Sequence, residues 1–141
     1  KYNIPIKEFN FDSNNVDKII PSKKEVVFNN CKIKVAEYYP DFYKAGMALR
    51  SCLTGYSNWQ KTLRLQHLRF FIYNKDNKVI GTILYDFTKK EVYGYKKEYK
   101  NFNEQTIVKI SKELNKICSI NLLDFDYTTH GQIKEYASEI L

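Results

Sequence analysis

Residues 68–96 read LRFFIYNKDNKVIGTILYDFTKKEVYGYK and contain three β-rich runs joined by short polar links. The runs cover residues 68–73, 79–87 and 91–96, and are rich in the aromatic and β-branched residues that favour strands. The links hold Asn, Asp, Lys and Thr, which suit tight turns. Because short links join neighbouring antiparallel strands, this segment predicts a three-stranded meander at the centre of a sheet.

The flanking segments alternate between strand and helix patterns. Strands are predicted at residues 25–28, 32–37 and 120–125, the first two forming a hairpin around Asn29-Asn30-Cys31. Apolar residues at helical spacing predict helices from Pro40 through Leu53 to a stop at Gly55, and over 57–66, 103–117 and 132–141. In the third of these helices, Asn103 is the expected N-cap.

This order of elements predicts a single α+β domain. Its antiparallel sheet has about four to six strands around the central meander 68–96, with helices packed mainly on one face. The 141 residues are 43% apolar and 16% aromatic, which is enough for one sizeable core. Residues 1–24 lack periodicity and are predicted to form an N-terminal arm or irregular lead-in, and residues 25–141 the domain.

Cellular location and thiol state follow from what the sequence lacks. No run of 18 apolar residues and no signal pattern is present, so a cytoplasmic protein without membrane partners is predicted. Cys31, Cys52 and Cys118 are odd in number and widely spaced, which favours reduced thiols over a disulfide framework or a metal site. No cofactor is predicted, and the oligomeric state stays open.

Positive charge is concentrated in the first half of the chain. Residues 1–70 hold twelve basic and six acidic residues, whereas residues 71–141 hold eleven and ten. Residues 42–75 contain no Asp or Glu at all. Such a one-signed stretch indicates an anionic partner, either nucleic acid or an acidic protein.

A second basic stretch, residues 89–102, interleaves lysine with tyrosine. Lysine neutralises phosphates and tyrosine stacks on unpaired bases, so single-stranded or structured nucleic acid is the favoured partner. The same alternation is also typical of a strand with one buried aromatic face. The residues predicted to bind nucleic acid are Lys44, Arg50, Arg64, Arg69, Lys96, Lys97, Lys100, Tyr95 and Tyr99.

Cys52 and His67 are a possible nucleophile and base, because distance along the chain does not forbid contact. However, the predicted helix places Cys52 near its C-terminal end, where the dipole raises a thiol pKa. We therefore expect Cys52 to be buried and unreactive, packed with Leu49 and Leu53. No catalytic residue is predicted.

Asp124 and Asp126, with His130 and Glu135 nearby, form the one acidic cluster that suggests a divalent metal. Alternate spacing in a strand puts both aspartates on one face. The same pattern is typical of a solvated strand end and no complete ligand set is present, so no metal site is predicted.

Residues 31–117 resemble the PcfJ-like proteins of plasmids, phages and related mobile genetic elements. In KIKVAEYYPDFYKAGMALRSCLTGY the residues Gly46, Leu49, Cys52 and Tyr56 match the helix that ends in a G-x-x-L-x-x-C pattern. The strands with Leu68, Arg69 and Thr82, and the closing strand and helix, match as well. The chain has Ser51 and Leu84 where the family often has His and Glu. The resemblance implies a setting in plasmid or phage biology, whereas the basic binding module is predicted from the charge alone.

The order of strands and helices also resembles the second half of a GNAT acetyltransferase fold. There, a glycine-rich turn before a helix presents backbone N–H groups to the pyrophosphate of coenzyme A. The corresponding segment here, EYKNFNEQT (residues 98–106), contains no glycine. A degenerate acyltransferase is therefore kept as an alternative at the level of the fold alone.

Overall fold

The computed structural model describes residues 21–131 and the backbone of residues 136 and 137. Its three α-helices are α2 (Tyr39–Leu49), α3 (Tyr56–Leu63) and α4 (Glu104–Leu114). Its strands are β1 (Glu25–Phe28), β2 (Cys31–Val35), β3 (His67–Tyr73), β4 (Val79–Asp86), β5 (Glu91–Lys96), β6 (Lys100–Phe102), β7 (Asp126–Tyr127) and β8 (Tyr136–Ala137). Short 3₁₀ turns cover Cys52–Thr54, Lys97–Tyr99 and Leu122–Asp124.

The strands form one sheet in the order β1-β2-β3-β4-β5-β6-β8, with β7 paired to β5. Neighbours from β1 to β6 are antiparallel, whereas β7 and β8 pair in parallel with β5 and β6. The predicted α+β class and the central meander are confirmed. Within the described residues the sheet has eight strands rather than four to six, because β6 and the two-residue strands β7 and β8 extend it.

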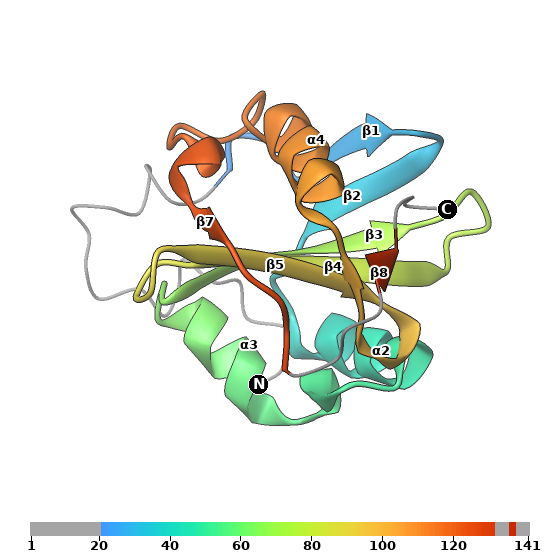
Figure 1. The fold of residues 1–141 in the computed structure, drawn as a ribbon. Helices are drawn as coiled ribbons and strands as arrows, with labels where there is room; N and C mark the ends of the chain where they lie inside the picture. The colour runs from blue at the N-terminus through green and yellow to red at the C-terminus, as the bar shows by residue number, and fades with distance from the viewer. Residues whose placement is uncertain (1–20, 132–135, 138–141) are drawn as a thin grey trace.

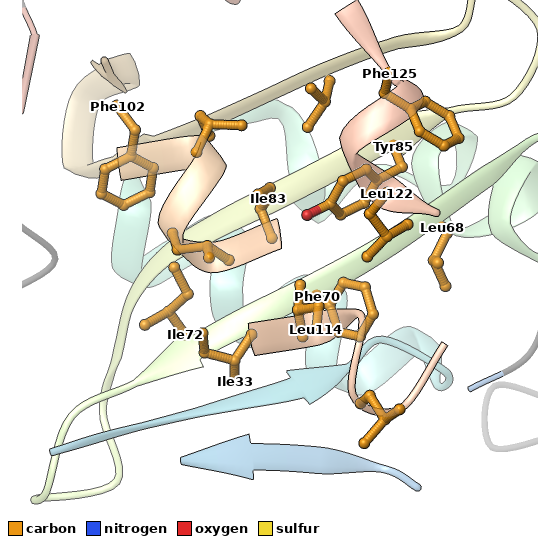
Figure 2. Packing of buried hydrophobic residues seen from close by; sticks show 14 of the residues in the cluster. Ile33, Leu68, Phe70, Ile72, Ile83, Tyr85, Phe102, Leu114, Leu122 and Phe125 are labelled. Carbon is orange, nitrogen blue, oxygen red and sulfur yellow. The ribbon is translucent and has the colours of Figure 1, made fainter. Parts of the chain in front are cut away.

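Helices cover both faces of this sheet (Figure 1). Two of the three, α2 and α3, lie against one face, and α4 lies against the other. The α4 face forms the larger apolar cluster, in which Ile107, Ile110 and Leu114 of the helix pack on Phe70, Ile83 and Tyr85 of the sheet. Figure 2 shows this packing. No helix among the described residues is long and apolar enough to cross a membrane.

Helix α4 begins where the sequence predicts. The side chain of Asn103 accepts a hydrogen bond from the Thr106 N–H at 2.9 Å, which satisfies one of the free donors of the first turn. The helix then buries Ile107, Ile110 and Leu114 at the spacing of one helical face.

Helix α2 is shorter than predicted and ends at Leu49 rather than near Leu53. Arg50 adopts a left-handed conformation with φ 52°, and the N–H groups of Arg50 and Ser51 both bond to the carbonyl of Gly46. A Cβ at Gly46 would lie 2.5 Å from the Thr54 backbone nitrogen, so glycine lets the chain turn back tightly onto the helix. The apolar spacing at Leu53 therefore belongs to the following 3₁₀ turn.

The last predicted strand, residues 120–125, is wrong. This segment holds a 3₁₀ turn at Leu122–Asp124, with Asn121 accepting a hydrogen bond from the Leu123 N–H. Most of the predicted helix 132–141 lies outside the described residues, and the two residues described within it form strand β8. Residues 1–20 of the predicted arm also lie outside them.

Candidate active site

The turn after α2 places Cys52 at the start of a new helical turn. Arg50 is left-handed and Ser51 is extended, so the chain reverses before Cys52 opens the 3₁₀ turn Cys52–Thr54. Helix α3 follows almost at once, beginning at Tyr56. Cys52 therefore lies at the N-terminal end of the second helical segment and not at the C-terminal end of the first, which removes the predicted dipole effect.

The thiol of Cys52 is exposed and hydrogen-bonded by polar side chains. A hydrogen bond from the His130 side chain is the main cause that lowers the pKa of Cys52, to about 6. Hydrogen bonds from Tyr99 and Asn58 act in the same direction and burial acts against them. The Asn58 amide nitrogen lies 3.7 Å from Sγ. The prediction that Cys52 is buried is wrong, whereas its low reactivity stays a prediction.

His130 reaches Cys52 from the segment after β7, held by its backbone and its ring. Its N–H donates to the Asn101 side-chain oxygen at 2.8 Å, and the Asn101 amide donates back to the His130 carbonyl at 3.4 Å. Asn101 is fully buried in β6, so these two hydrogen bonds attach the backbone of His130 to the sheet. The imidazole stacks on Tyr99 with 4.5 Å between centroids and meets Tyr93 and Tyr95 at its edges.

Tyr99 contacts both Cys52 and His130. Its hydroxyl accepts a hydrogen bond from the Cys52 N–H at 2.6 Å. Burial and the neighbouring thiol raise the pKa of Tyr99 to about 12, which keeps the hydroxyl protonated. Glu98 and Tyr99 both have a positive φ, at 61° and 59°, and the Glu98 carboxylate pairs with Arg50 at 2.9 Å. Such a backbone is strained for residues other than glycine and is concentrated at functional sites.

Cys52 and His130 lie on the wall of a cleft of about 590 Å³. This volume is within the range of small-molecule sites. The cleft runs from the start of α3 across the ends of β3, β4 and β5 to residues 128–131. Its charged and titratable lining residues besides Cys52 and His130 are Lys61, His67, Asp86, Lys89, Glu91 and Tyr93.

His67 lines the same cleft, where it contacts Asp86. It is 8% exposed, and its Nε2 lies 3.6 Å from an Asp86 carboxylate oxygen. Burial first, and then the positive charge of Arg69, lower the pKa of His67 to about 4 despite Asp86. The imidazole is therefore neutral at pH 7 and its contact with Asp86 is not an ion pair. The histidine that partners Cys52 is His130 rather than the predicted His67.

Two residues predicted to bind nucleic acid are core residues. Arg69 is 1% exposed and donates to the Thr82 hydroxyl at 2.9 Å, which in turn donates to the Phe70 carbonyl. Tyr95 is also 1% exposed and belongs to the core under α2. Both are buried because helices cover both faces of the sheet, so that neither side of a central strand faces solvent. Neither can contact an outside partner, so their assignment is wrong.

The other predicted residues have different surroundings. Arg50 pairs with Glu98, and Tyr99 belongs to the Cys52 site. Lys44 lines a separate hollow beside α2. Arg64, Lys97 and Lys100 are exposed and Lys96 is half-buried. The binding of nucleic acid or of an acidic protein stays a prediction.

The acidic cluster also differs from the expectation. Asp124 closes a 3₁₀ turn whereas Asp126 begins β7, so the two do not alternate along one strand. Among the residues that the structure describes, no group of three or more His, Cys, Asp or Glu side chains could hold a metal ion.

Comparison with known proteins adds no relative. No family model matches the chain, and neither the curated proteins nor the solved structures searched contain a match. The resemblance to PcfJ-like proteins, and the plasmid or phage role that it implies, therefore stay predictions.

Proposed function

We propose that the protein is a thiol-dependent acyl-transfer hydrolase with Cys52 as nucleophile and His130 as the proton-transfer group. The single observation that carries this proposal is the exposed Cys52 thiol, hydrogen-bonded by His130 at the wall of a cleft. With a pKa of about 6, roughly nine-tenths of the thiol is ionised at pH 7, against about one-hundredth at its ordinary value of 9.0.

The reaction has two balanced halves. The Cys52 thiolate attacks a carbonyl carbon, and when the tetrahedral intermediate collapses, the bond to the leaving group breaks and His130 gives that group its proton. This leaves a thioester on Cys52. Water then attacks the thioester while His130 takes the proton from the water, and the carboxylic acid leaves with the thiol restored.

Polar groups beside the thiol support the charged intermediate. The Asn58 amide lies 3.7 Å from Sγ, and the Tyr99 hydroxyl is held at the Cys52 N–H. Both groups hydrogen-bond Sγ in the free protein, and once Sγ has bonded to carbon and lost its charge, the same donors can stabilise the adjacent negative carbonyl oxygen. The hydrogen bonds to Asn101 and the stacked Tyr99 ring hold His130 in place, so its side chain needs to move little during the reaction.

A stopped-flow assay with p-nitrophenyl acetate tests the proposal without knowledge of the natural substrate. We expect a burst of nitrophenolate equal to the amount of enzyme, with acetyl on Cys52 located by peptide mass spectrometry. Cys52→Ala abolishes the burst, and His130→Gln slows it about 10²- to 10⁴-fold, as loss of proton-transfer catalysis requires. The matched control is Cys118→Ala, because burial raises the pKa of that thiol to about 12. Acetylation elsewhere, or an unchanged burst in Cys52→Ala, contradicts the proposal.

A further inference from the structure

A basic surface lies at the opposite end of the β3–β4 hairpin from the cleft. The register pairs His67 with Asp86 at the cleft end and Tyr73 with Val79 at the turn end. At about 3.3 Å per residue, the seven residues of β3 separate the two ends by about 20 Å. In Figure 1 the β3–β4 turn lies at the end of the molecule that is away from α3, on the side of α2. A ligand bound at the turn end therefore does not need to contact Cys52.

Two neighbouring hollows meet at this turn. One, of about 540 Å³, lies along β2, and the other, of about 640 Å³, lies between the turn and α2. They share Lys34, Asn74 and Asn77 in their linings. Together they are surrounded by five lysines, called here the five-lysine surface: Lys32, Lys34, Lys44, Lys75 and Lys78.

The five lysines outnumber the acidic groups around them: besides Asp41, Asp76 lies in the turn between Lys75 and Lys78, and Glu25 is the β1 partner of Lys34. Asp41 is the one carboxylate in the two linings, and burial raises its pKa even though Lys44 and Lys34 lower it. None of the five forms an ion pair with a described residue, whereas Lys24, Arg50 and Lys116 each do. Like charges that gather without partners oppose folding, and an anionic ligand offsets that repulsion.

The neutral polar groups around the hollows also suit an anion. Asn74 uses its side-chain oxygen to accept the N–H groups of Asp76 and Lys78, both at 3.0 Å. The amide nitrogen of Asn74 makes no hydrogen bond to a described residue, so it can donate to a ligand. Ammonium and amide donors are what phosphate oxygens require.

We propose that the five-lysine surface binds the phosphodiester backbone of a nucleic acid strand. Several point charges spread over two connected hollows fit a ligand with repeated phosphates better than a single anion. A protein partner usually needs an aromatic or Arg-filled apolar centre. Among their described lining residues, the two hollows lack such a centre. The Lys34 ammonium covers the Tyr73 ring, at 5.0 Å from its centroid, and among the large apolar side chains in the linings Val27 is the strongly exposed one.

The test is fluorescence anisotropy with a labelled single strand of about 20 nucleotides of mixed sequence. If all five lysines neutralise phosphates, affinity falls about 130-fold between roughly 50 and 200 mM salt. The double variant Lys75→Ala/Lys78→Ala loses two contacts, so its affinity at low salt is weaker and its salt effect falls to about 20-fold. The matched control, Lys109→Ala/Lys112→Ala, removes the same charge from exposed positions of α4 and binds like the native protein.

Three results would overturn the proposal. Equal loss of affinity in the two double variants shows that net charge alone drives binding. Affinity that does not depend on salt excludes phosphate contacts. Polyglutamate competing as well as unlabelled oligonucleotide at equal charge assigns the surface to an acidic protein. In each case, Cys52→Ala binds like the native protein, because the cleft and the five-lysine surface are separate.

Discussion

Alkylation of Cys52 should follow pH with a midpoint near 6 instead of the 9.0 of an ordinary thiol. The thiolate is the reactive form, so a lowered pKa shifts the onset of reaction to lower pH. At pH 7 the ionised fraction is about 90-fold larger than that of a thiol with a pKa of 9. Each thiolate is about 20-fold less nucleophilic, since nucleophilicity falls by about 0.45 log units for each unit of pKa. The net gain is about fourfold.

The shape of the profile is therefore a sharper test than the rate at one pH. We would measure iodoacetamide labelling from pH 5 to 9 by peptide mass spectrometry, which separates Cys52 from Cys31 and Cys118. The native rate should stay flat between pH 7 and 9. In His130→Asn, which loses the main cause of the shift, the midpoint should move up from 6 towards 9.0, so the rate should still rise over that interval. A native midpoint near 9, or an unchanged midpoint in His130→Asn, refutes the reasoning.

Three further variants and one pH profile test how the fold supports the cleft. Gly46→Ala places a methyl group 2.5 Å from the Thr54 backbone nitrogen, so the free energy of unfolding, measured by urea denaturation, should fall by about 1–3 kcal/mol. Gly55→Ala is the control, because its methyl group would have its nearest contact at 3.8 Å and should change the free energy of unfolding little. Native stability should rise with pH between about 4 and 6.5, because the unfolded state protonates His67 in that window and the folded state does not. By NMR titration, Arg69→Met should raise the pKa of His67 only part of the way to 6.5, since burial is the larger cause; no change would show that the guanidinium is not the source.

Local sequence patterns were sufficient for the central meander, the β1–β2 hairpin and the start of α4. The meander could be predicted because strand alternation and short turns act within about ten residues, and Asn103 caps α4 through a contact three residues away. The end of α2 could not be predicted in the same way. Apolar spacing continues through Leu53, and only the contact between Gly46 and Thr54 shows that the helix has already ended.

The same limit applied to the basic residues. Net charge gave the sign of a partner, yet charge along the chain does not reveal which side chains face outward. Arg69 lies inside the sheet with Thr82, although arginine is seldom fully buried. Tyr99 was singled out for stacking on a base and instead stacks on His130, so the residue type was informative while its partner was not.

The Cys52 site depends on contacts between distant segments. Two contacts bring His130 to Cys52. One is the pairing of β7 with β5, and the other is the hydrogen bond from the His130 N–H to Asn101 of β6, 29 residues earlier in the sequence. Neither contact leaves a local pattern, because β7 is only two residues long and Asn101 lies in a three-residue strand. No pattern local to Cys52 or to His130 therefore points to the other residue.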